Sequence, residues 1–274
     1  MKVAAFESRM EAEMRRLISR HGGEPLVAPA LREMPLEDNR AVFEFGDHLL
    51  AGDLGMVILL TGVGTKTMVE VLQTRHPLAT IKQALSRITL VARGPKPLAA
   101  LRELGLTPDI TVPEPNTWRD ILQVLDARCS LTGLRMAVQE YGTSNKNLLE
   151  GLRGRGADVT AVPVYRWALP EDLRPLRKVL DAILAGQVDV LLITNAAQVD
   201  HVMQVLSESR QIAAFRQAVM SMAVASVGPT ASERLRSYDL PVDLEPSHPK
   251  MGLLVKEAGE QAAVLLARKR QSSK

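Results

Sequence analysis

The sequence predicts two α/β domains of doubly wound type, produced by the duplication of one unit. The first observation is an internal repeat, because residues 22–32 (GGEPLVAPALR) align without a gap with residues 156–166 (GADVTAVPVYR), 134 positions later (166 − 32). The same spacing joins Gly94-Pro95 to Gly228-Pro229. Solenoid repeats run from roughly 20 to 50 residues. This longer period therefore indicates two copies of a domain-sized unit.

The second observation is a regular alternation of short apolar runs with helical patterns, which favours parallel sheets covered on both faces. The first copy opens with a strand at residues 2–6 and a helix at residues 10–21, which Gly22-Gly23 ends. An extended run at residues 26–34 holds Pro29, and a proline indicates an edge or a strand that leaves its sheet. The remaining elements are expected as strands at 57–61, 89–92 and 110–112, a loop at 62–65, and helices ending near 74, at 78–86, after Gly94-Pro95 and at 118–125.

The second copy repeats this order. Its extended run, residues 159–168, holds Pro163 where the first copy has Pro29. Taken from the pattern alone, the two domains would follow one another along the chain. The other elements are expected as strands at 136–139, 188–194, 223–227 and 242–244, and as helices from Asn145, at 198–209, 213–220, 231–238 and about 250–268.

Composition limits the classes of partner. The chain has 274 residues, of which 46% are hydrophobic, so each half can bury an ordinary core. The 34 Lys and Arg residues face 31 Asp and Glu residues, a net charge of only +3. A nucleic-acid site needs a concentrated basic face, whereas the one basic cluster, residues 268–270, fits the solvated end of a helix. No nucleic-acid partner is expected.

Three features predict a cytoplasmic protein with no membrane partner. The single cysteine, Cys129, excludes an internal disulfide and a cysteine-based metal cage, which fits a reducing compartment. Charged side chains at Glu7, Arg9, Glu11 and Glu13 interrupt the stretch in which a signal peptide needs an apolar core. The apolar run at residues 56–60 is far too short to cross a bilayer.

The familiar catalytic and cofactor motifs are missing. Gly62-Val63-Gly64 is followed by Thr67 at the place of the third glycine in a dinucleotide-binding motif. The five histidines are scattered, without metal-ligand spacing. The sequence therefore predicts neither a cofactor nor a metal.

What remains is a set of loops at the carboxyl ends of strands, where open α/β sheets bind ligands. Most run into a helix start, whose free backbone N–H groups favour anions. Their Ser, Thr and Asn residues either cap these helices or bind a ligand, and both interpretations stay open. One helix N-terminus contributes only ~0.3–1 kcal/mol, whereas micromolar affinity needs roughly 8 kcal/mol, so a polycarboxylate would need several of them. The loops are residues 7–9, 61–65, 93–96, 140–145, 194–196, 228–230 and 246–250.

Five segments together resemble the uroporphyrinogen-III synthase family over essentially the whole chain. None is specific alone, and their order carries the resemblance. They are RGPKPLAALRELGL at residues 93–106, VPVYRW at 162–167, LLITNAAQVDHV at 191–202, the turn Gly228-Pro229-Thr230, and EPSHPKMGLLV at 245–255.

The resemblance implies an unusual topology, in which a two-stranded crossover linker joins the two doubly wound, parallel-sheet domains. Each copy's opening strand–helix–strand segment would then complete the other copy's domain, and the two proline-bearing runs would be the crossing strands. The implied domains are residues 1–30 with 168–274 and residues 36–162, with linker strands at 31–35 and 163–167.

The resemblance also implies an activity. Members of this family are lyases that close hydroxymethylbilane, which carries eight carboxylates, into uroporphyrinogen III with inversion of ring D. The implied chemistry is loss of the terminal hydroxyl to give an azafulvene, attack through the substituted carbon of ring D, and fragmentation of the resulting spiro intermediate. The family implies no cofactor and no metal, and we expect a monomer that makes at most transient contact with hydroxymethylbilane synthase.

By the same resemblance, Tyr165 matches the family's active-site tyrosine. A phenol, whose ordinary pKa is about 10, is protonated at neutral pH and can donate to the departing hydroxyl. The alternative for Tyr165 is a hinge tyrosine that bonds backbone. Thr230 matches a family threonine, although Ala231 follows it where relatives can carry a second hydroxyl. The expected substrate-binding residues are Ser8, Arg9, Thr61, Gly62, Val63, Arg93, Gly94, Lys96, Tyr141, Gly142, Thr194, Asn195, Ala196, Gly228 and Thr230.

Two functions of other classes compete with this one. A non-catalytic tetrapyrrole-binding sensor on the same scaffold would want an output module, and the residues after Arg268 offer only a short polar tail. A two-domain sugar- or amino-acid-binding protein would want a secretion signal. The enzyme is therefore the preferred hypothesis.

Overall fold

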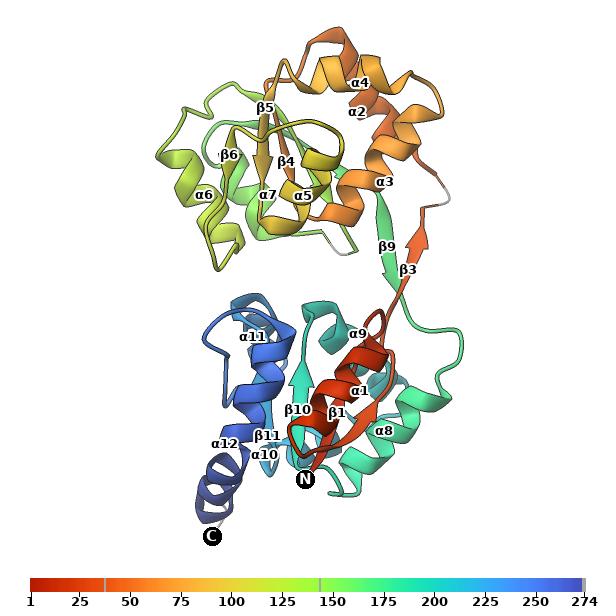
Figure 1. Ribbon diagram of the computed structural model, residues 1–274, viewed down its shortest axis with the longest axis vertical. Coiled ribbons are helices and arrows are strands. Elements are labelled where there is room, and N and C mark those ends of the chain that lie inside the picture. Colours follow the sequence, from red (N-terminus) through yellow and green to blue (C-terminus); the bar gives the residue numbers. More distant parts are fainter. Residues whose placement is uncertain (37, 143, 273–274) are drawn as a thin grey trace. The chain divides into compact units, whose positions relative to one another are not determined.

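The computed structural model describes residues 1–36, 38–142 and 144–272. The chain forms two compact units (Figure 1). Unit 1 is Met1–Arg32 with Ala168–Lys274, and unit 2 is Glu33–Trp167. Unit 2 is thus inserted into unit 1. The domain limits that the resemblance implies stay a prediction.

Unit 1 is built on a parallel sheet with the strand order β11-β10-β1-β2. Its strands are β1 (Lys2–Ala5), β2 (Glu24–Val27), β10 (Val190–Ile193) and β11 (Ala223–Ser226). Its helices are α1 (Glu11–Arg20), α8 (Arg174–Leu184), α9 (Ala196–Glu208), α10 (Ile212–Met220), α11 (Pro229–Arg236) and α12 (Met251–Ser272).

Helices cover both faces of this sheet, because successive strand residues point to opposite sides. On one face Val3 and Ala5 pack with apolar residues of α1 and α12, including Met14 and Leu254. On the other face Ala4 packs with the apolar residues of α8, α9, α10 and α11. This two-sided burial is why the strands have near-continuous apolar sequences.

Unit 2 repeats the design on a parallel sheet with the order β6-β5-β4-β7-β8. Its strands are β4 (Met56–Leu59), β5 (Thr89–Ala92), β6 (Ile110–Thr111), β7 (Arg135–Glu140) and β8 (Asp158–Pro163). Its helices are α2 (Arg40–Ala51), α3 (Gly62–Gln73), α4 (Leu78–Leu85), α5 (Pro95–Glu103), α6 (Trp118–Asp126) and α7 (Lys146–Arg153).

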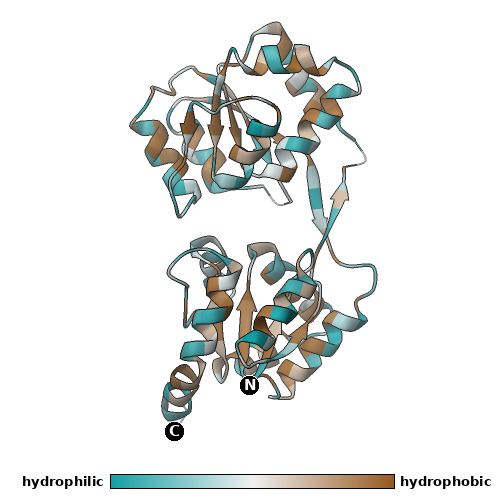
Figure 2. Cartoon of the chain, in the orientation of Figure 1, coloured by the Kyte–Doolittle hydropathy of each residue, from teal (hydrophilic) through white to brown (hydrophobic). Residues whose placement is uncertain are grey.

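The same burial pattern holds in unit 2. Val57 and Leu59 of β4 pack with α2 to α5, whereas Met56 and Ile58 pack with α6 and α7. Figure 2 shows this distribution, with apolar strands inside each unit and helices that alternate between polar and apolar residues. The two units are therefore doubly wound α/β folds, and the predicted fold class is confirmed.

The strand pairing confirms the crossing topology. Val3 of β1 pairs with Val190 of β10, so the opening strand of the first copy lies in the sheet of the second. Met136 of β7 pairs with Met56 of β4, which is the reciprocal arrangement. Two domains in simple sequence order are thus excluded.

The two proline-bearing runs differ from the expectation, because each divides into two strands. The first parts, β2 and β8, belong to the parallel sheets. The second parts, β3 (Arg32–Pro35) and β9 (Tyr165–Ala168), form a separate two-stranded sheet. Pro163 ends β8, and Pro29 lies in the break between β2 and β3, where the missing proline N–H costs no ladder hydrogen bond.

The duplication is also visible in single hydrogen bonds. The backbone N–H of Leu90 donates to the Asp109 carboxylate at 2.8 Å, and that of Val224 donates to the Asp243 carboxylate at 2.7 Å. Each partner in the second bond lies 134 positions after its counterpart in the first (224 − 90 and 243 − 109). These bonds tie the segment after α5 to β5 and the segment after α11 to β11.

Asp243→Ala should destabilise the protein more than the matched change Asp109→Ala. Both changes leave a backbone N–H without its acceptor, at a cost of about 1–2 kcal/mol. Asp243 in addition pairs with Lys269 at 2.6 Å, and their side chains are only 17% and 14% exposed. Losing a partner of a buried ion pair brings the expected loss to about 3 kcal/mol. Urea titration of both variants measures the difference, and equal losses would show that the ion pair contributes nothing.

One further difference concerns helix starts. The expected loop at residues 62–65 is the first turn of α3, which Thr61 caps by accepting the Gly64 N–H at 3.0 Å.

Within the described parts of the chain, no helix is long and apolar enough to cross a membrane.

Candidate functional site

In unit 2 the expected site residues follow three neighbouring strands. Thr61, Gly62 and Val63 follow β4, Arg93 to Lys96 follow β5, and Tyr141 and Gly142 follow β7. The chain continues from β4 to β5 on one side, whereas β7 lies on the other side of β4. This is the switch point at which open α/β sheets bind their ligands.

The end of β4 is fixed by a buried glutamine on β7. Gln139 is fully buried, and its Oε1 accepts the Thr61 N–H at 3.2 Å. Its Nε2 donates to the Glu140 carbonyl at 2.6 Å. The Thr61 hydroxyl oxygen accepts the Gly64 N–H, so this side chain works first as a helix cap.

Two helix N-termini lie against each other at this edge. A Cβ on Gly62 would be 2.6 Å from the Lys96 carbonyl oxygen, so only glycine allows the first turns of α3 and α5 to approach this closely. Lys96 is exposed and Arg93 half-exposed beside these turns. The free N–H groups and the two cations together favour carboxylates.

Arg93 holds Tyr141. Its Nη1 donates to the Tyr141 hydroxyl oxygen at 2.7 Å, and its guanidinium carbon lies 5.2 Å from the centre of the Tyr141 ring. Both side chains are partly exposed. The phenol hydrogen of Tyr141 is thus left to donate to another group, because the Arg93 bond uses only the oxygen.

Tyr165 begins β9 and lies in an aromatic cluster. Its side chain is 6% exposed, with the ring 6.5 Å from that of Tyr141 and 5.4 Å from that of Trp167, in an edge-to-face arrangement. The Gly142 N–H donates to the Tyr165 carbonyl at 3.1 Å. Tyr165, which the resemblance assigns to the active site, is thus more buried than Tyr141. The catalytic role of Tyr165 stays a prediction. Thr143, in the expected loop 140–145, lies outside the described residues.

In unit 1 the corresponding edge carries Thr194, Asn195 and Ala196 after β10. Asn195 caps α9 by accepting the Ala197 N–H at 2.9 Å. Gln198, which is 2% exposed, accepts the Thr194 N–H at 3.0 Å and donates to the Thr194 hydroxyl at 2.8 Å. A buried glutamine thus fixes the threonine after the central strand in both units.

The other expected residues of unit 1 follow the neighbouring strands β1 and β11. Ser8 and Arg9 follow β1, and the Ser8 hydroxyl accepts the Leu31 N–H at 3.4 Å. Gly228 precedes α11, and Thr230 is exposed in its first turn. All expected residues of unit 1 therefore lie at the carboxyl ends of β11, β10 and β1.

Sequence reasoning missed two polar residues, Gln139 and Gln198, and it included a third, Glu7, only as part of the expected loop 7–9. Gln139 interrupts an apolar strand, which signals a buried amide with a specific partner. Gln198 completes the Asn-x-x-Gln pattern of a capping box. Glu7 accepts a hydrogen bond from the Thr194 hydroxyl at 2.5 Å, and no local pattern predicts this contact.

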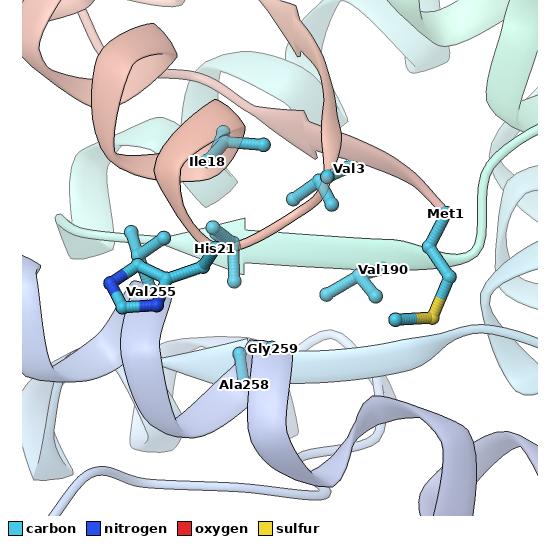
Figure 3. Close-up of a pocket in the computed structure, with 10 residues that line it drawn as sticks. Met1, Val3, Ile18, His21, Val190, Val255, Ala258 and Gly259 are labelled. Atoms are coloured by element: carbon cyan, nitrogen blue, oxygen red, sulfur yellow. The ribbon is translucent and has the colours of Figure 1, made fainter.

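The small cavity of unit 1 lies elsewhere (Figure 3). Its lining includes Met1, Val3 and Val190 near the amino ends of the strands, with Ala258 and Gly259 of α12. Its volume of about 20 Å³ has room for about one water molecule, so it is not a substrate site. Among the described residues, no group of three or more His, Cys, Asp and Glu side chains is placed to hold a metal ion.

Strand ends that present helix N-termini, threonines and basic side chains in an α/β protein are suited to small anionic ligands. Comparison with known proteins gives the family. The model of uroporphyrinogen-III synthase HemD matches residues 12–256, and the chain belongs to the uroporphyrinogen-III synthase family.

Relatives and solved structures are similar over nearly the whole chain. The uncharacterized protein YjjA of Bacillus subtilis is 26% identical over 264 residues, which is 93% of this chain and 94% of that protein. A mutant uroporphyrinogen III synthase of Thermus thermophilus is 24% identical, with a TM-score of 0.70 over 99% of both chains. A further structure of the Thermus thermophilus enzyme is 26% identical, with a TM-score of 0.54 over 96% of this chain and 99% of that one.

Proposed function

We propose that the protein is a uroporphyrinogen-III synthase, a lyase that cyclises hydroxymethylbilane to uroporphyrinogen III with inversion of ring D. The observation that carries this proposal is the family match over residues 12–256, combined with strand ends suited to carboxylates in each unit. The product serves tetrapyrrole biosynthesis. We propose that the enzyme acts as a monomer without a cofactor, in transient contact with hydroxymethylbilane synthase.

The substrate's carboxylates would bind mainly to backbone N–H groups. In unit 2 the adjoining starts of α3 and α5 lie beside two cations, Arg93 and Lys96. Side-chain hydroxyls such as that of Thr61 already cap helices, which leaves the free N–H groups of the first turns for the ligand. Binding would thus depend on many weak contacts.

The proton for the departing hydroxyl would come from Tyr165. Its carbonyl accepts the Gly142 N–H, so β9 is held to the loop after β7 while the phenol lies among aromatic rings. A phenol of ordinary pKa, about 10, is protonated at neutral pH and can act as a general acid.

A coupled assay tests the activity. Hydroxymethylbilane is generated by hydroxymethylbilane synthase, the products are oxidised, and isomers III and I are separated chromatographically. We expect isomer III in large excess, because isomer I forms without an enzyme. Product that is mainly isomer I, together with tight binding of uroporphyrin, would instead indicate a tetrapyrrole-binding sensor.

The three threonines should each be less important than the general acid. Thr61→Ala, Thr194→Ala and Thr230→Ala should lower turnover by less than about tenfold, since the backbone N–H groups of the first helical turns stay in place. The product should stay predominantly isomer III. Single-turnover rates and isomer ratios check this, and an inactive but folded threonine variant would assign the proton donor to that loop.

A further inference from the structure

The carboxylate of Glu7 lies at the switch point of unit 1. It follows β1, and the Thr194 hydroxyl after β10 donates to its Oε2 at 2.5 Å. Its Oε1 accepts the Met10 N–H at the start of α1, at 3.3 Å. The hydrogen bond between Glu7 and Thr194 therefore spans the two neighbouring strands between which the strand order of this sheet reverses.

The surrounding network fixes the direction of this hydrogen bond. Gln198 Nε2 donates to the Thr194 hydroxyl oxygen, so the hydroxyl hydrogen is free to point to Glu7. An ionised carboxylate has about four acceptor positions, of which these contacts occupy two. Because the Glu7 side chain is partly exposed, the other two remain accessible to a ligand.

The equivalent position in unit 2 has the opposite character. Tyr141 lies 134 residues after Glu7 (141 − 7), and Arg93 donates to it. One copy of the repeated edge thus carries a cation and a phenol, and the other carries a carboxylate. A carboxylate repels the carboxylates of a ligand, so a ligand group that contacts Glu7 has to be one that donates hydrogen bonds.

We propose that Glu7 accepts hydrogen bonds from the pyrrole N–H groups of the substrate. This inference rests on the proposed function, whose substrate combines carboxylates with four pyrrole N–H donors. When the terminal hydroxyl leaves, the C–O bond breaks with its electron pair on oxygen, which takes one proton and departs as water. The positive charge is shared between the methylene carbon and the pyrrole nitrogen. Its N–H then donates more strongly, and Glu7 stabilises this state more than the ground state.

The sign of a binding change tests the proposal. Glu7→Gln removes a negative charge near a polyanionic ligand, which on Coulombic grounds alone should tighten binding. If Glu7 accepts pyrrole N–H bonds, Glu7→Gln should instead weaken the affinity for uroporphyrinogen III about tenfold, since bonds to a charged acceptor are roughly twice as strong as neutral ones. Anaerobic calorimetry measures this, with Glu11→Gln on α1 as the matched control, for which we expect unchanged affinity.

Each outcome decides the question. Equal or tighter binding by folded Glu7→Gln, with a wild-type protein that makes isomer III, would overturn the role of Glu7 alone. A wild-type protein that neither binds uroporphyrinogen III nor makes isomer III would overturn the proposed function, and this role with it. Should Glu7→Gln fail to fold, Glu7→Asp replaces it with the same expected direction, because the shorter side chain withdraws the carboxylate. Benzenehexacarboxylate, which lacks N–H donors, should bind Glu7→Gln at least as tightly as wild type.

Discussion

Replacing Tyr165 with phenylalanine is expected to lower the turnover of hydroxymethylbilane by roughly 10- to 10³-fold, the effect of losing one general acid or hydrogen-bond donor. In the proposed reaction isomer I forms without an enzyme, so the protein would mainly hold the bilane folded while ring D inverts. Help for the departing hydroxyl would be a smaller part of the catalysis. Turnover should fall while isomer III still predominates, and single-turnover kinetics with isomer analysis measure both.

The other two tyrosines provide controls. Tyr238 lies in unit 1, where burial and then its hydrogen bond to Asp200 raise the pKa of its phenol. Because the Tyr238 hydroxyl already donates its hydrogen to Asp200, Tyr238→Phe should leave turnover unchanged. Tyr141→Phe removes the acceptor of Arg93 and should have an intermediate effect. Full activity of Tyr165→Phe with loss of activity in Tyr141→Phe would move the donor to Tyr141.

A methyl group at Gly142 should have the largest effect on stability at the aromatic cluster. Gly142 has a φ of 61°, and its added Cβ would be 1.7 Å from Cδ1 of Trp167. The indole ring would have to move and lose its edge-to-face contact with Tyr165, worth about 0.5–1.5 kcal/mol. The left-handed conformation costs an alanine about 1–2 kcal/mol more. Gly142→Ala should thus lower the free energy of unfolding, measured by urea titration, by about 2–3 kcal/mol. Its turnover should fall as well.

Gly52→Ala separates the two causes. Gly52 belongs to the same unit and has a φ of 77°, but no heavy atom lies within 4 Å of an added Cβ. It should show only the cost of the left-handed conformation, about 1–2 kcal/mol, with unchanged turnover. Equal losses of stability in both variants would mean that Trp167 moves aside without cost.

The strand pairing followed from the repeat and the resemblance, but the division of the long runs did not. Whether β3 and β9 separate from β2 and β8 depends on pairing between residues more than 100 positions apart, to which local propensity is insensitive. Gly62 and Gly64 indicated a loop because glycine disfavours helices. Both lie in the first turn of α3, which Thr61 caps, and glycine is required there because Lys96 and Gln139 approach too closely for any Cβ.

At the candidate site, local contacts were predictable from the sequence and distant contacts were not. Residues that cap their own helix, such as Thr61 and Asn195, are recognisable from local sequence. Their remaining partners are distant, since Gln139 is 78 residues from Thr61 and Glu7 is 187 residues from Thr194. Such contacts exist only after the sheet has formed, so a single sequence does not identify the partners, although Gln139 within an apolar strand signals that it has one.

The insertion of unit 2 into unit 1 also orders events during synthesis. Every strand of the unit 2 sheet comes from one continuous stretch, so that sheet has all its partners once Trp167 has been made. β1 of unit 1 has β2 beside it early, but its other neighbour, β10, begins only at Val190. At roughly 5–20 residues per second, the apolar edge of β1 waits roughly 10 to 40 s for its partner. On the ribosome, the inserted unit can therefore fold first, while the N-terminal segment stays exposed to wrong pairing and to chaperones.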